Sequence, residues 1–189
     1  MRKKISRTAY GIALPALLWL TATQAMAQEC QVLVSRPEIQ LGSQPPAVDG
    51  KAQFAQQMLT VTATCSGEGA VSLLVDGTPD ESGKYFRFGE RGRMALKLLS
   101  AQYNGADTAL TVISAERGER QFRPGQAERL SAGNQLTVRK ATGDDSSSQQ
   151  LTLQMQLDFP ASNNEGRMRD RMEMSGQLRF EAVQTAPPP

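Results

Sequence analysis

Apolar and polar residues alternate with a period of two along much of the chain. In the segment 151–159, LTLQMQLDF, every odd position is leucine, methionine or phenylalanine and every even position is polar. The segment 58–65 alternates in the same way, with threonine at 60, 62 and 64. This pattern is typical of an antiparallel strand that buries one face and exposes the other to water.

Other segments predict further strands, and the alternation is as clean at 172–182 as at 151–159. They lie at 31–41, 71–75, 94–98, 110–112, 136–138 and 172–182. No segment combines a 3.6-residue period with helix caps, and clusters of Gly, Pro, Asn and Asp predict loops at 42–50, 78–83, 143–148 and 161–166. The sequence therefore predicts one all-β domain, an antiparallel β-sandwich.

The N-terminus has the features of a secretory signal peptide. Four cations between Arg2 and Arg7 precede an apolar run from Ala9 to Leu20, and Ala25-Met26-Ala27 fits a cleavage site. The apolar run is too short to span a bilayer. We expect 1–27 to be removed, leaving 28–189 as a single exported domain with a short proline-rich tail at 184–189. A lipid-modified Cys30 is disfavoured, because Gln28 and Glu29 are not the small residues that such a site requires.

Composition narrows the function classes. The chain has no histidine, and its one tryptophan, Trp19, lies in the predicted signal. We therefore expect no catalytic site, metal or cofactor. A glycosidase with a carboxylate pair is a weaker alternative, because none of the 19 acids stands out. Without the four cations of the predicted signal, the chain has 17 Lys and Arg and 19 Asp and Glu, so its net charge is near −2. This composition gives no basic stripe for binding nucleic acid.

The two cysteines, Cys30 and Cys65, predict one disulfide, because exported proteins fold in an oxidising compartment. The bond would join the start of the first predicted strand to the end of the second. It would close a loop of about 36 residues, worth roughly 4 kcal/mol in the chain-entropy estimate.

The order of these segments resembles the bacterial chaperone–usher pilin family over nearly all of the mature chain. The matching segments are CQVLVSRPEIQLG from Cys30, LTVTATCSGEGAVSLLVDGT from Leu59, LTLQMQLDFPAS from Leu151 and MSGQLRFEA from Met174. The resemblance implies an immunoglobulin-like sandwich that lacks its last strand. A periplasmic chaperone fills the gap first, and the N-terminal extension of the next subunit fills it later.

The resemblance also implies a groove, partners and a location. The acceptor groove would have as its edges Val32, Val34, Ile39, Leu41, Met172, Met174, Leu178, Phe180 and Ala182. The implied partners are the pilus chaperone, the outer-membrane usher, a neighbouring pilin that donates a strand, and a host receptor. The protein would pass through the periplasm to a fimbrium on the cell surface.

Two features depart from the family pattern. Only Gln28 and Glu29 lie between the predicted cleavage site and Cys30, so the subunit would accept a donor strand without offering one. It would then sit at the fibre tip, where single-domain adhesins and invasins of this family occur. The last aromatic residue is Phe180, whereas pilins usually end their last strand with an aromatic near the carboxylate, so the resemblance does not define how the chaperone docks.

Other interpretations stay open. The aromatic and basic run Tyr85, Phe86, Arg87 and Phe88 is a candidate receptor contact, since aromatic residues and arginine are enriched at interaction hot spots. Ordinary strand packing explains the same residues. The whole domain could also be a freestanding periplasmic or secreted β-sandwich that binds a ligand without polymerising.

Overall fold

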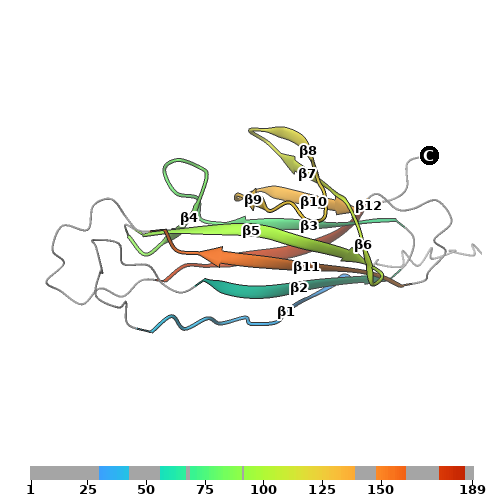
Figure 1. Cartoon of the computed structure of the whole chain (residues 1–189), viewed down its shortest axis with the longest axis horizontal. Helices are drawn as coiled ribbons and strands as arrows, with labels where there is room; N and C mark the ends of the chain where they lie inside the picture. The colour runs from blue at the N-terminus through green and yellow to red at the C-terminus, as the bar shows by residue number, and fades with distance from the viewer. Residues whose placement is uncertain are drawn as a thin grey trace, which may run out of the picture.

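The computed structural model describes residues 30–42, 56–66, 69–90, 92–138, 148–160 and 175–185. These residues form two antiparallel sheets packed face to face, which confirms the predicted all-β sandwich (Figure 1). No helix in this described part of the chain is long and apolar enough to cross a membrane. The predicted signal peptide lies outside the described residues.

The first sheet carries the longest strands. Its main path runs through β1 (Cys30–Val34), β2 (Gln57–Ser66), β11 (Ser148–Asp158), β5 (Gly92–Tyr103) and β4 (Phe86–Phe88). The short strands β6 (Ala106–Asp107) and β9 (Glu128–Leu130) also pair with β5.

The second sheet covers the inner face of the first. Its order is β12 (Leu178–Thr185), β3 (Ala70–Gly77), β10 (Asn134–Val138), β7 (Leu110–Ser114) and β8 (Gly118–Phe122). Among the described strands, β1 and β12 therefore each form an edge of a different sheet.

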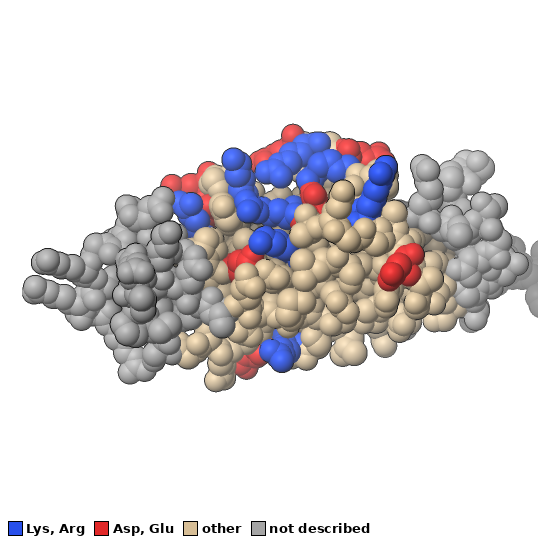
Figure 2. Space-filling view, in the orientation of Figure 1, with Lys and Arg blue, Asp and Glu red and all other residues tan. Residues whose placement is uncertain are grey.

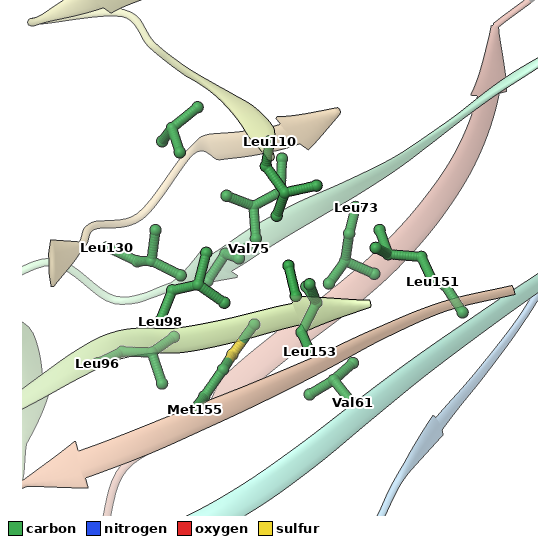
Figure 3. Close-up of a cluster of buried hydrophobic side chains, with 14 of the residues drawn as sticks. Val61, Leu73, Val75, Leu96, Leu98, Leu110, Leu130, Leu151, Leu153 and Met155 are labelled. Atoms are coloured by element: carbon green, nitrogen blue, oxygen red, sulfur yellow. The ribbon is translucent and has the colours of Figure 1, made fainter. Parts of the chain in front are cut away.

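The core lies between the sheets and is built from the alternating positions. Leu151, Leu153 and Met155 on β11 are fully buried, while Gln154 between them is exposed. Figure 3 shows these side chains in one cluster with Leu73 and Val75 of β3 and Leu110 of β7. Burying large aliphatic side chains is the main favourable term in folding, at about 1.5–3 kcal/mol each. The predicted alternation of 58–65 and 151–159 is confirmed.

Two predicted strand boundaries are wrong. The strand predicted at 31–41 ends at Val34, where the Ser35 amide donates to the Thr60 carbonyl and the Thr60 amide donates to the Ser35 hydroxyl, both at 2.9 Å. Beyond this point Pro37 has no N–H to give to a strand ladder. The last strand begins at Leu178, because 175–177 are not paired as a strand. Residues 172 and 174 lie outside the described residues.

The predicted disulfide is present between Cys30 and Cys65. The two cysteines lie directly opposite each other in the register of β1 and β2, and Cys65 is fully buried. The bond therefore fixes β1, which is paired on one side only, to the body of the sandwich. It also indicates an oxidising, extracytoplasmic environment.

We predict that the variant Cys30→Ser/Cys65→Ser unfolds at lower urea concentration than the wild type. Losing the cross-link should lower the free energy of unfolding by about 2–4 kcal/mol, because the unfolded chain regains loop entropy. Dithiothreitol should lower the wild-type midpoint to that of the variant and leave the variant unchanged. Equal midpoints for the oxidised wild type and the variant would contradict this role.

A cross-strand ion pair joins β11 to β5. Lys97 Nζ lies 2.7 Å from Asp158 Oδ2, and Gln156 Nε2 donates to Asp158 Oδ1 at 2.7 Å. Burial by itself raises the pKa of Asp158, but hydrogen bonds from Lys97 and Gln156 and the charge of Lys97 outweigh burial and lower it.

Because the pKa of Asp158 is lower in the folded state, its contribution to stability exists above the unfolded pKa of about 3.9 and disappears as pH falls through the folded value. We predict that Asp158→Asn lowers the free energy of unfolding at pH 7 by at most about 1 kcal/mol, since the pair is partly exposed. The difference should shrink below pH 3 in urea titrations. If Asp158→Asn lowered the free energy of unfolding by the same amount at pH 7 and below pH 3, the charge of Asp158 would not be the cause.

Candidate functional site

An apolar groove lies between the free edges of the two sheets. One wall is β1 with the irregular segment 36–41, and the other wall is the start of β12. The cavity has a volume of about 380 Å³. We call it the edge groove, and it is lined by Val32, Val34, Arg36, Pro37, Ile39, Leu41, Leu59, Phe88, Met94, Leu157, Phe159, Gly176, Leu178, Arg179 and Phe180.

The edge groove exists because the two edges do not meet in a ladder. The chain leaves β2 after Ser35, so 36–41 form a separate wall instead of continuing the sheet. The inward-facing residues Val32, Val34, Leu178 and Phe180 are therefore partly buried, whereas the equivalent positions of β11 are fully buried or nearly so. The described residues therefore leave part of the apolar surface of the edge groove exposed.

The floor of the edge groove consists of side chains from the strands behind it. Leu59 of β2 and Leu157 of β11 line it, and the rings of Phe88 and Phe159 pack at 5.0 Å between centroids. This distance is typical of a favourable tilted aromatic pair. The floor is therefore firm, apolar and continuous with the core.

Gly176 closes one end of the edge groove. A Cβ atom at this position would lie 3.0 Å from the Arg87 carbonyl oxygen and 3.2 Å from Phe88 Cδ2. The Gly89 amide also donates to the Ser175 carbonyl at 2.7 Å. A glycine here thus lets the segment before β12 approach β4 closely.

Charge at the edge groove is positive on both walls. Arg36 lies on the first wall and Arg179 on the second, and both are exposed. Arg179 Nη2 lies 3.6 Å from Glu181 Oε2 at the surface, where such a pair contributes little to stability. The walls are therefore apolar inside and basic at the rim.

Most of the predicted groove residues lie together in space. Val32, Val34, Ile39, Leu41, Leu178 and Phe180 line the cavity. Ala182 lies on the same face of β12 and packs against the core without lining the cavity. Met172 and Met174 lie outside the described residues.

The residues that form the floor of the edge groove were not predicted from the sequence. Leu59, Leu157 and Phe159 belong to the inward sets of two alternating segments, and that pattern marks them only as core. Met94 and Phe88 reach the groove through the pairing of β4 with β5, which no local pattern revealed.

The candidate receptor contact at 85–88 does not form one surface. Phe86 is fully buried in the core, so its assignment to a contact surface is wrong. Phe88 faces the edge groove, because alternate residues of a strand share a face. Tyr85 is half-buried and Arg87 is exposed.

The chemistry of the edge groove suits a peptide strand. Its walls carry apolar side chains in alternation and each is next to a strand edge, which is the arrangement used in β-strand addition. Among the described residues, no group of three or more Cys, Asp or Glu side chains is placed to hold a metal ion.

No protein-family model matches the chain, and no curated protein matches it either.

We predict that a cysteine placed in the edge groove is accessible to solvent. In Leu178→Cys the thiol should react with a water-soluble maleimide roughly a hundredfold faster or more than in Leu136→Cys, because Leu136 is fully buried in β10 and exposed only when the protein opens. Mass spectrometry follows the labelling. Equal rates would mean that the groove is closed in solution.

Proposed function

We propose that this chain is a fimbrial subunit assembled by the chaperone–usher route, and that the edge groove accepts a donor strand from a partner. The observation that carries the proposal is the groove itself, an apolar cavity bounded by the edge strands of two different sheets. The resemblance of segment order to pilins supports the same assignment.

The physical basis is strand addition. Edge strands present backbone N–H and C=O groups that another strand can pair with. The incoming segment would place alternate apolar side chains, about 6–7 Å apart, against the floor at Leu59, Leu157 and Phe159. Its remaining side chains would face solvent near Arg36 and Arg179.

Cys30 and its disulfide hold the first wall of the groove in place. The bond anchors β1 directly before the segment 36–41, so this wall cannot separate from β2 at its start. A cross-linked wall suits a site that is filled first by a chaperone and then by another subunit. In this proposal the usher receives the chaperone-bound subunit, and the product is exposed at the cell surface.

We further propose a position at the fibre tip with a role in adhesion. This part rests on the two residues between the predicted cleavage site at Ala27 and Cys30, which are too few for a donor strand. A tip subunit is the one that meets a receptor first.

Peptides corresponding to the N-terminal donor segments of major pilins test the groove. A cognate peptide of about 12 residues with alternating apolar positions should raise the melting temperature of the purified full chain, because it binds the folded state. It should also slow maleimide labelling of Leu178→Cys. A scrambled peptide of the same composition should do neither.

Two matched variants locate the binding. Phe180→Asp puts a charge into the edge groove and should abolish the shift, whereas Val183→Asp, at a position 42% exposed, should keep it. Failure of every cognate peptide to stabilise the wild type would contradict donor-strand acceptance. It would favour a freestanding β-sandwich.

A further inference from the structure

Four cations form two cross-strand pairs on the outer face of the first sheet. Arg87 of β4 lies opposite Arg93 of β5, and Arg129 of β9 lies opposite Lys97 of β5. We call Arg87, Arg93, Lys97 and Arg129 the cationic ladder. Their sequence neighbours Phe86, Met94, Leu96 and Leu130 are buried, so the four cations point away from the core.

Both pairs use the same edge of β5. Strand β11 occupies the other edge of β5 from Ala95 onward, and β4 and β9 follow one another along the opposite side. Arg93 and Lys97 are four residues apart, which corresponds to about 13 Å along a strand. Figure 2 shows Lys and Arg on this side of the molecule, extending over the β7–β8 hairpin and with Asp and Glu among them.

Like charges directly opposite each other destabilise a sheet. The chain places two such pairs side by side although its mature part carries no excess of cations. Burial in the core does not account for Arg87 and Arg129, because both side chains are exposed. The two pairs therefore concentrate positive charge on this face of the sheet.

Tyr85 holds two of the guanidinium groups in place. The Arg93 and Arg129 Cζ atoms lie 5.8 and 5.0 Å from the centre of its ring, and Arg129 Nη1 donates to the Tyr85 hydroxyl at 3.3 Å. Cation–π contacts at these distances are attractive. Tyr85 therefore contacts one arginine of each cross-strand pair. Because these contacts already restrict Arg93 and Arg129, the two side chains would lose less conformational entropy on binding a ligand.

Acidic groups neutralise only half of the cationic ladder. Asp80 Oδ2 lies 3.7 Å from Arg93 Nε, and Asp158 pairs with Lys97. Within the described residues, no acidic side chain is within ion-pair distance of Arg87 or Arg129, and both are exposed. Each of the two cross-strand pairs thus keeps one guanidinium group without an acidic partner among the described residues.

We propose that the cationic ladder binds an acidic polysaccharide through its carboxylate or sulfate groups. Guanidinium groups bind such oxyanions in a bidentate manner. Arg87 and Arg129, one from each cross-strand pair, would contact repeated anionic groups along an extended polysaccharide chain. The disulfide indicates an extracytoplasmic protein, and acidic polysaccharides are extended polyanions that such a protein can meet.

This binding surface is separate from the edge groove. The ladder lies on the outer face of the first sheet, whereas the groove opens between the sheets. The proposal therefore does not depend on donor-strand acceptance, and either one can fail alone.

Binding to immobilised heparin and dextran sulfate tests the ladder. Arg87→Gln/Arg129→Gln should weaken binding roughly tenfold or more in 0.15 M NaCl, because it removes the two unneutralised guanidinium groups. The control Arg117→Gln/Arg123→Gln removes the same charge from exposed positions beside β8 and should bind like the wild type. Neutral dextran should bind none of the proteins.

A second variant distinguishes the loss of binding groups from a loss of folded structure. Arg87→Lys/Arg129→Lys keeps both charges but loses the bidentate guanidinium geometry, so it should bind more tightly than Arg87→Gln/Arg129→Gln and more weakly than the wild type. All variants should retain the wild-type melting temperature within a few degrees. Equal losses in the two Gln double variants would overturn the site, as would no binding by the wild type. Ladder-dependent binding to phosphatidylserine vesicles, without binding to the polysaccharides, would replace the proposed ligand with a membrane surface.

Discussion

The five-residue pairing of β1 with β2 is the constraint on which the edge groove depends. The register runs from Cys30 opposite Cys65 to Val34 opposite Val61 and then stops, whereas β11 follows β2 to its first residue, Gln57. Had β1 continued alongside β2, the segment 36–41 would lie in the sheet and would no longer stand as a separate wall. The disulfide at one end of this short pairing and the Ser35–Thr60 hydrogen bonds at the other define where the wall begins.

The remainder of the sandwich supports this opening. Leu151, Leu153 and Met155 bind the two sheets into a fully buried core, so the molecule can leave apolar side chains at its edges partly uncovered. Edge strands with apolar faces promote aggregation unless something covers them. A donated strand would remove this hazard and complete the core in one step, which is why the groove and the assembly route fit each other physically.

The sequence predicted the interior better than the edges. The alternation at 151–159 identified β11 because every odd residue is buried by the opposite sheet. The strand predicted at 31–41 was too long, since apolar residues such as Ile39 and Leu41 that line a groove look like residues that face a sheet. Resemblance to pilins, and not the pattern alone, placed Val34, Ile39, Leu178 and Phe180 together.

Residues 85–93 show what the sequence could not reveal. Tyr85, Phe86, Arg87 and Phe88 read as one aromatic and basic run, but strand alternation sends Phe86 into the core and Arg87 to the surface. The cationic ladder was invisible because its rungs join β4, β5 and β9, and these registers arise only from tertiary pairing.

Hydrogen–deuterium exchange of backbone amides is the most direct measurement of the central claim, that the edge strands stand open for a partner strand. In the free protein we expect the amides of β1 and β12 to exchange faster than those of β11 and β5. With a donor segment bound, protection should rise at β1 and β12 and stay unchanged at β11 and β5. Edge amides that are already as protected as those of β11 in the free protein, or that gain no protection with any donor, would contradict it.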